Sequence, residues 1–528
     1  MSSNFYTVKS CLEPETTSVE KGRNSFAAKW SFLTILAAVL IIYLGFPTKV
    51  YYWDGVSFAQ HIEQADLRPV ALLHPNHLLY SPLGHRIWSL ANSFGLNVRA
   101  LTVLQVLNSI MAAAAVAVMF SVLVSVVNSG YVAACLSLAF AFSATWWKFA
   151  TDANSYIPSV AVLLVCLRLL VPERRVSPVT LGLVHAASML FHELAVLFFP
   201  AAVAGLYLQE TRRVRPKRLA AVVQYTLTAA GCTLVVYYLA FVASHGNFDF
   251  PAFLRWISSH SAGASFSFSI WNNTLVSLAG HVKLLFGGQL RLVREQWDGR
   301  MALTIIATIA VLGIFLLEMY RRPLWPFSTK CETKAVLSIS LTTIASYELF
   351  LFLWLPHNTF YRLFYLPAIV LVVGIFLRGL QRTGQLRLAF GVAAIFLLNF
   401  SFHIYPQTRP AANRTLGIAA EMQTIWPQNT IVYWDVYSSD NQTIRYFNPQ
   451  VEWKELWGRA WISQIEESVS KASRNGGQLW FDGPAMTKFR SEDAEFRRWL
   501  DQNCRLVQEK DFSRLGKKVG FVQLVCSV

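Results

Sequence analysis

Ionisable side chains are concentrated in one stretch of the chain, residues 51–88, whose sequence is YYWDGVSFAQHIEQADLRPVALLHPNHLLYSPLGHRIW. Asp54, His74 and His77 belong to this stretch, which follows shortly after the apolar segment 27–46. Ionisable groups beside a membrane are unfavourable unless they are solvated or used. Residues 51–88 are therefore the first place where we expect chemistry.

Three further turns carry groups of the same kind. They contain Asp152, the pair His192-Glu193, and the group His357, Tyr361 and Arg362. The order of membrane spans derived below puts these turns on the same face as Asp54, and helical bundles bring such turns together around one cavity. Carboxylates, imidazoles and one guanidinium at a membrane–water boundary suit a reaction between a polar acceptor and a lipid-borne anion.

Each of these residues also has a purely structural interpretation. Asp54 could cap a helix over 55–64, and Asp152 could cap a helix that begins near Tyr156. His74-Pro75-Asn76 could be a simple turn, His192-Glu193 a solvated hairpin tip, and Arg362 an interfacial anchor beside Tyr361. His192 does not begin an H-E-x-x-H zinc motif, because Val196 occupies the fifth position.

The composition is typical of a membrane protein. Of the 528 residues, 54% are hydrophobic and 14% are charged, whereas soluble domains carry about 25% charged residues. Several apolar runs approach or exceed the roughly 20 residues that span a bilayer. The net charge of +16 does not indicate nucleic-acid binding, because the basic residues cluster in short loops between apolar segments. Such loops set the orientation of a membrane protein by the positive-inside rule.

The basic loops and the apolar lengths predict a mainly α fold with about eleven membrane spans. Its parts are an inside tail over 1–27, a polytopic bundle over 28–405 with outer loops at 47–97 and 243–300, and an outer α/β domain over 406–528. The apolar residues 179–208 lie between two basic clusters that both belong on the inside, so this segment must cross the membrane an even number of times. We therefore expect a hairpin with His192-Glu193 at its outer tip.

Residues 406–528 alternate short apolar runs with polar periodic segments, which is typical of a small α/β domain. We predict strands over 431–437, 479–482 and 519–525 and helices over 414–425, 455–472 and 492–503. The two cysteines of this domain, Cys504 and Cys526, would lie in an oxidising compartment. They form either a disulfide or two buried thiols.

The chain resembles the polytopic GT-C glycosyltransferases that use polyprenyl- or dolichyl-phosphate sugars. The resemblance is to protein O-mannosyltransferases and bacterial relatives, and it extends over the predicted bundle. It lies in Trp53-Asp54, in HPNHLLYSPLG from His74 to Gly84, and in the short motifs Ala153–Tyr156, Leu190–Glu193 and Tyr361–Pro367. Relatives often have Glu-x-Tyr where this chain has Asn154-Ser155-Tyr156, so Asp152 is the candidate for the second acidic residue.

This resemblance implies an inverting transfer of a sugar from a polyprenyl-phosphate donor to an acceptor hydroxyl on a glycan, a lipid or a protein. Asp54 would be the general base, and Asp152 the second catalytic carboxylate. Arg362 would hold the donor phosphate with two parallel hydrogen bonds. His74 or His77 would donate to the phosphate or position a divalent metal, for which no ligands are assigned. His192, Glu193 and Tyr361 would complete the substrate site.

Two other classes of protein fit a polytopic chain. One is a lipid or solute transporter with the charged turns as its gate, and the other is a non-catalytic assembly protein of the envelope. Transporters often show pseudo-symmetry between two halves, which this sequence lacks. We therefore expect a membrane glycosyltransferase. In a bacterium it would lie in the cytoplasmic membrane, with its N-terminus inside and its C-terminal domain outside.

Overall fold

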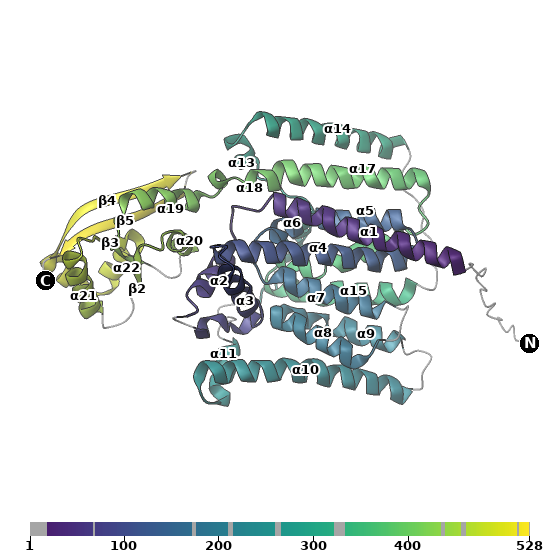
Figure 1. Ribbon diagram of the computed structural model, residues 1–528, viewed down its shortest axis with the longest axis horizontal. Helices are drawn as coiled ribbons and strands as arrows, with labels where there is room; N and C mark the ends of the chain where they lie inside the picture. Colours follow the sequence, from purple (N-terminus) through teal and green to yellow (C-terminus); the bar gives the residue numbers. More distant parts are fainter. Residues whose placement is uncertain are drawn as a thin grey trace, which may run out of the picture.

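A bundle of long helices and a smaller C-terminal α/β domain make up the structure, which is a computed structural model (Figure 1). The first helix starts at the end of the bundle far from the C-terminal domain, and the opposite end, named the domain end below, faces that domain. The structure describes residues 18–66, 69–171, 176–209, 215–258, 266–321, 333–434, 439–455, 461–514 and 517–526.

The bundle is built from helices that run roughly parallel to the long axis of the molecule (Figure 1). They are α1 (Ser18–Gly45), α4 (Ala100–Val127), α5 (Gly130–Ala141), α7 (Tyr156–Leu170), α8 (Pro178–Phe191), α9 (Phe199–Gln209), α10 (Arg215–His245), α14 (Gly299–Arg321), α15 (Lys334–Trp354), α16 (Leu366–Phe376) and α17 (Arg382–Asn399). The short helix α6 (Ala144–Ala150) follows α5 in a different direction.

Within the described residues, five helices are long and apolar enough to cross a membrane. A sixth is added if α5 and α6, which are bent by 69° at their junction, form one span. The remaining bundle helices are apolar but shorter. The chain is an integral membrane protein with the mainly α fold predicted from its sequence, whereas the number of eleven spans stays a prediction.

Helix α4 lies at the centre of the bundle, where it packs against α1, α5 and α7. Most of its 28 residues are apolar and most are buried, as expected of a helix at the centre of a bundle. It ends where Asn128 adopts a left-handed conformation with φ 56°, and Ser129 then caps α5 through the amide of Val132. The tight turn at 128–130 thus returns the chain directly along α4.

The domain end carries the connections from which the site is built. They comprise α2 (Trp53–Glu63), the 3₁₀ helices η1 (Pro69–Leu72) and η2 (Pro75–His77), α3 (Tyr80–Ser93), α11 (Phe250–Ser258), α12 (Ile270–Leu285), α13 (Leu290–Glu295) and the 3₁₀ helix η5 (Phe360–Phe364). The predicted hairpin is also present: α8 stops at Phe191, His192 is extended, and the 3₁₀ helix η3 (Glu193–Phe198) leads into α9.

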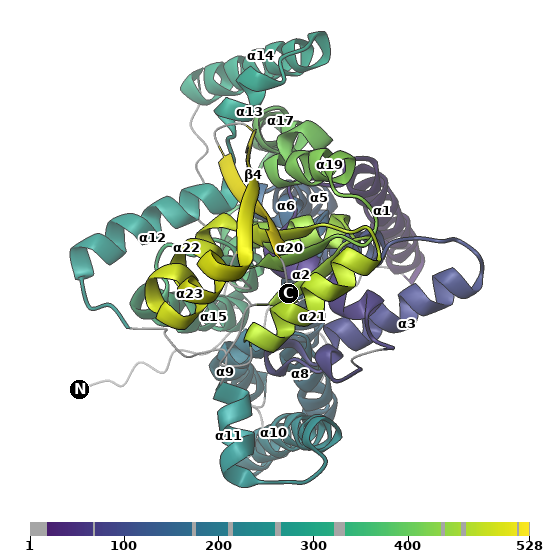
Figure 2. The ribbon, with the colours of Figure 1, turned by 90° about the vertical axis from the view of Figure 1, so that its left-hand side faces the viewer.

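In the described residues of the C-terminal domain, five strands form one sheet with the order β2-β1-β3-β5-β4. Its strands β1, β2 and β3 are parallel, and β5 runs antiparallel to both β3 and β4. The strands are β1 (Ile431–Trp434), β2 (Glu452–Glu455), β3 (Leu479–Asp482), β4 (Cys504–Arg514) and β5 (Lys517–Cys526), and the helices are α19 (Arg414–Ile425), α20 (Ser439–Phe447), α21 (Trp461–Arg474), α22 (Gly483–Glu492) and α23 (Ala494–Asn503). Figure 2 shows this domain in front of the domain end.

Alternate residues of the central strands pack into two hydrophobic cores on opposite faces of the sheet. Ile431 and Phe481 belong to the core that α21 and α23 cover, whereas Val432 and Trp480 belong to the core beside α19. Both faces are buried, so these strands read as continuous apolar runs in the sequence.

The predicted helix over 455–472 begins too early, because Glu455 is the last residue of β2 and α21 begins at Trp461.

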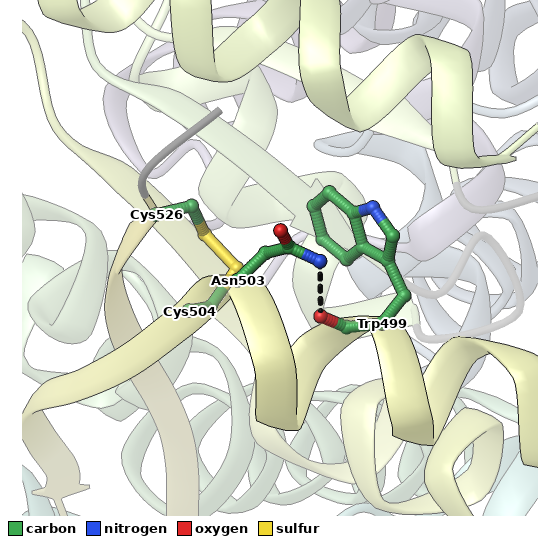
Figure 3. The surroundings of a disulfide bond; sticks show 4 residues. All are labelled: Trp499, Asn503, Cys504 and Cys526. Carbon is green, nitrogen blue, oxygen red and sulfur yellow. Dashed lines mark hydrogen bonds between the residues drawn. A yellow bond between two sulfur atoms is a disulfide. The ribbon is translucent and has the colours of Figure 1, made fainter.

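Cys504 and Cys526 form a disulfide where β4 begins and β5 ends (Figure 3). The two residues are directly opposite each other in the antiparallel pairing. We expect intact-mass measurement after alkylation to find no label on these two cysteines unless a reductant is added first. Two labelled thiols at these positions without reductant would rule the bridge out.

The orientation of the bundle can be tested with reporter fusions. Lys217 at the start of α10 and Arg382 at the start of α17 lie at the ends of their helices that are far from the C-terminal domain (Figure 1). The positive-inside rule places such basic ends in the cytoplasm. Fusions at both residues should give a cytoplasmic signal, and a fusion at the C-terminus should give the opposite one. An extracytoplasmic signal at Lys217 would contradict the hairpin and the orientation together.

Candidate active site

Asp54 lies in the first turn of α2, and the chain that leads to it is fixed at several points. The amide of Lys49 donates to the carbonyl of Gln407 at 2.7 Å, and Gln105 donates to the carbonyl of Thr48 at 2.8 Å. The amide of Tyr52, which is the N-cap of α2, donates to Asp152 at 2.8 Å. Because α2 begins at Trp53, Asp54 does not cap a helix.

The surroundings of Asp54 change its acidity. Burial raises the pKa of its carboxyl to about 6, and the neighbouring hydroxyl of Tyr52 opposes part of that rise. The position in the first turn also favours the charged form, since the helix dipole stabilises an anion there. A carboxylate with a pKa near 6 is still ionised at neutral pH and is a stronger base than an ordinary aspartate.

Three tyrosines and an imidazole form a cluster beside Asp54. The hydroxyls of Tyr52 and Tyr156 are 3.0 Å apart. The ring centre of Tyr156 is 5.6 Å from that of Tyr361 and 4.9 Å from that of His192. Burial, followed by the charges of Asp54 and Glu193, raises the pKa of Tyr361 to about 12. These hydroxyls therefore stay protonated at neutral pH and can donate hydrogen bonds.

His192 connects this cluster to the turn at 74–77. The Nδ1 atom of His192 accepts the amide N–H of Leu194 at 3.1 Å. Burial, and then the charge of His74, lower the pKa of His192 to about 3. The ring is thus neutral, with its proton on Nε2, so it can donate a hydrogen bond but supplies no positive charge.

The imidazoles of His74 and His77 are stacked with ring centres 4.1 Å apart. Their turn is held by α10, because the hydroxyl of Tyr237 donates to the carbonyl of Pro75 at 2.6 Å. It is also held by α8, since the amide of Leu79 donates to the carbonyl of Leu190 at 3.0 Å. The turn at 74–77 therefore lies against the end of α8, next to the turn at 192–193, and these hydrogen bonds fix its position.

Asp152 is fully buried and forms an ion pair with Lys148 at the end of α6. It also accepts the amides of Tyr52 and Ala153, at 2.8 and 2.9 Å. It does not cap α7, because the side chain of Asn154 accepts the amide of Ile157 in that place. Within the described residues, the carboxylate of Asp152 thus holds the segment before α2. Its predicted catalytic role stays a prediction.

Arg362 is also fully buried. One terminal nitrogen contacts Glu348 of α15 at 2.5 Å, and the other donates to Ser277 of α12 at 2.8 Å and to the carbonyl of Pro356 at 2.9 Å. A residue in this position is not an interfacial anchor. Its role as a phosphate ligand stays a prediction, and in this arrangement a phosphate would have to displace protein partners.

The predicted residues therefore divide into two groups. Asp54, His192 and Tyr361 belong to one aromatic cluster, the stacked pair of His74 and His77 is near enough for its charge to act on His192, and Glu193 is exposed. Asp152 and Arg362 lie in separate buried networks, and His357 is exposed. Within the described residues, no three His, Cys, Asp or Glu side chains are grouped so that they could hold a metal ion.

Sequence reasoning did not assign Tyr52, Tyr156 or Lys148 to the site. Two signals in the sequence pointed to them. Tyr52 directly precedes the Trp53-Asp54 pair, and Lys148 stands four residues before Asp152, which is the spacing of an ion pair on one face of a helix. Tyr156 ends the motif Ala153–Tyr156, but its contacts with Tyr52, His192 and Tyr361 depend on the packing of distant segments.

A search of solved structures finds this arrangement of bundle and domain in a crystal structure of ArnT from Cupriavidus metallidurans bound to undecaprenyl phosphate. The match has a TM-score of 0.58 and 11% sequence identity, and it covers 93% of this chain and 97% of that one. The chain shares the fold of ArnT. A structure of ArnT in the apo state matches with a TM-score of 0.48 and 12% identity over 96% of this chain and 98% of that one.

The match to ArnT covers the bundle and the C-terminal domain together. At 11% identity it shows a shared fold, a helical membrane bundle followed by a C-terminal domain, as predicted from the sequence. No protein-family model matches the chain, and no curated protein matches it in sequence.

Proposed function

We propose that the protein transfers a sugar from a polyprenyl-phosphate donor to an acceptor hydroxyl, with inversion at the anomeric carbon. Asp54 is the general base in this proposal. It removes the proton of the acceptor hydroxyl as the oxygen attacks the anomeric carbon, and the bond from that carbon to the lipid phosphate breaks. The products are a glycoside and a polyprenyl phosphate.

The observation that carries the proposal is the setting of Asp54. Its carboxyl has a pKa raised to about 6 by burial, and it lies beside hydroxyl groups that stay protonated, in a bundle with the fold of ArnT. An ordinary exposed aspartate would be a weaker base at neutral pH. ArnT was crystallised with undecaprenyl phosphate bound, which supports a ligand of the same class here.

The leaving group is a phosphate, so the proposal requires hydrogen-bond donors rather than a strong general acid. His74, His77 and Tyr361 are the donors that we assign to the phosphate, and the neutral His192 orients Tyr361, because their ring centres are 5.8 Å apart. Glu193 is assigned to the sugar hydroxyls at the exposed edge. Arg362 and Asp152 are assigned to positioning, since protein groups contact both terminal nitrogens of Arg362 and the carboxylate of Asp152.

Sugar transfer by the purified full-length protein tests the proposal. Labelled polyprenyl-phosphate sugars carrying a hexose, a pentose, an aminopentose and an N-acetylhexosamine would be incubated with the protein and a membrane extract as acceptor. At least one donor should yield a labelled product and free polyprenyl phosphate in equal amounts. If no donor is consumed, a transporter or an assembly protein becomes the better interpretation.

The pKa of Asp54 gives this activity a defined pH dependence. A general base must be deprotonated, so kcat/KM should be constant above about pH 7 and fall about tenfold per pH unit well below pH 6. His192 cannot cause this inflection, because its pKa is lowered to about 3. The same profile measured with His74→Gln should keep the inflection. A profile that stays flat down to pH 5 would contradict the assignment of Asp54.

A further inference from the structure

A polar pocket of about 140 Å³ lies between α2 and the C-terminal domain. One wall is a face of α2 formed by Ser57, Gln60, His61 and Gln64. The spacing of these positions places them on one side of a helix. Asp54 precedes Ser57 by three residues and is on the same side, so the pocket begins one helical turn from the proposed base.

The opposite wall is formed where parallel strands of the sheet end. Trp434 is the last residue of β1, Glu455 is the last residue of β2, and the two are partners in the register of the sheet. Gln442 and Arg445 of α20 also belong to this wall. In sheets with parallel strands, ligands bind in the crevice outside the carboxyl ends of the strands.

Two buried polar atoms of this wall lack a hydrogen-bond partner within the described part of the chain. They are Nε1 of Trp434, which is a donor, and Oε1 of Gln442, which is an acceptor. The whole side chain of Trp434 is only 2% exposed. An unpaired buried polar atom destabilises a protein unless another group satisfies it. Trp434 and Gln442 both line the pocket, and hydroxyl groups, which can donate and accept, suit a donor and an acceptor alike.

The two walls of the pocket are held together by a contact between the bundle and the C-terminal domain. Glu63, at the end of α2, accepts from Arg99 at 2.9 Å and from the hydroxyl of Tyr446 at 2.7 Å. The guanidinium of Arg99 also lies 4.0 Å from the ring centre of Tyr446. This arrangement fixes α20 against α2, so the pocket has a preformed shape and loses little freedom when a ligand binds.

We propose that this pocket is a saccharide subsite that binds a sugar unit of a glycan acceptor. The inference rests on the proposed function and specifies its acceptor as a glycan. A sugar ring carries several hydroxyls, which suit the side-chain amides of Gln60, Gln64 and Gln442 and the indole N–H of Trp434. The lining is polar apart from Trp434 and Ala71, so it offers little to an apolar peptide side chain.

The position of the subsite sets the direction of the acceptor. The proposed base is at the N-terminal end of α2, and the pocket extends along the same face towards Gln64. A sugar unit in the pocket would therefore direct the next unit of the glycan along α2, towards Asp54. The reacting hydroxyl is then on a sugar unit that neighbours the bound one.

Binding, measured apart from transfer, tests the subsite. The full-length protein in detergent would be titrated by calorimetry with trisaccharides of a neutral hexose, a pentose, an N-acetylhexosamine and a uronic acid. At least one should bind, and Trp434→Phe and Gln442→Leu should each weaken its binding by about 3- to 10-fold, the effect of losing one hydrogen bond.

Trp426→Phe is the matched control. Its indole nitrogen is also buried without a partner among the described residues, and its side chain is 3% exposed, but it lies in the core beside α19 and not at the pocket. This variant should bind as the native chain does. The subsite is overturned if no trisaccharide binds, or if Trp434→Phe and Gln442→Leu have no larger effect than Trp426→Phe. Saccharide binding without any sugar transfer would keep the subsite and remove the proposed function.

Discussion

Replacing Asp54 by asparagine is expected to lower the rate of sugar transfer by about 100-fold or more, which is the usual scale for the loss of a general base. Asparagine has almost the same shape, so the fold and the binding of the donor should be kept. Its amide cannot accept a proton at neutral pH. The measurement is kcat with a saturating labelled donor, together with thermal unfolding to show that the variant is folded.

Asp66→Asn is the matched control for this variant. Asp66 follows α2 in the same acidic and histidine-rich stretch, but its side chain is exposed. Its replacement should leave kcat within about twofold of the native value, because an exposed surface group contributes little. If Asp54→Asn retains nearly full activity while Asp152→Asn removes it without unfolding the protein, the base has been assigned to the wrong turn.

The parts of the fold that depend on local chain properties could be predicted from the sequence. Apolar lengths and basic loops indicated the bundle helices, and the two basic clusters around 179–208 required the hairpin at His192. The strand at 479–482 and the helix at 414–425 have the predicted limits. Each of these segments carries its own signal, such as an apolar run with clear ends or a capping asparagine.

Two strands were missed because they are the edges of the sheet. Strand β2 reads EWKE and β4 reads CRLVQEKDFSR. Edge strands carry charged residues that discourage pairing with other chains, so neither has the apolar run by which β1 and β3 were found. Their place in the sheet depends on partners far along the chain, and no local property of the sequence provides it.

The distinction between local sequence signals and long-range packing also explains how much of the candidate site could be predicted. Residue types and turns identified Asp54, His74, His77, His192 and Tyr361, because they come from connections at one end of the bundle. What each side chain contacts is a property of tertiary packing. Arg362 was predicted to hold a phosphate, and that role stays a prediction. Nothing in the sequence indicated that Glu348, fourteen positions earlier in α15, contacts its guanidinium, because that contact depends on the position of α15.

Replacing Lys148 by methionine is expected to be among the most destabilising single changes in the bundle. Asp152 is completely buried, and Lys148, with 14% of its side chain exposed, is its ion-pair partner. Methionine keeps the length of the side chain but leaves the carboxylate buried without a compensating charge. Breaking a buried pair in this way typically lowers the free energy of unfolding by about 3–5 kcal/mol.

Unfolding in mixed micelles, followed by circular dichroism, would measure this effect. Lys283→Met is the control, because Lys283 is also in the last turn of its helix, α12, but is exposed. Its free energy of unfolding should change by less than about 0.5 kcal/mol. The double variant Lys148→Met with Asp152→Asn should be more stable than Lys148→Met alone, because both partners are then neutral and asparagine can still accept the amide N–H of Tyr52.

Comparing these single and double variants also distinguishes a positioning role of Asp152 from a catalytic one. If the ion pair positions the segment before α2, Lys148→Met should lower transfer activity together with stability, since Asp152 holds the amide of Tyr52 at 2.8 Å. The double variant should then recover part of both. If Lys148→Met is as stable as the native chain, and Asp152→Asn removes activity without lowering stability, Asp152 acts on the substrate and the positioning role is wrong.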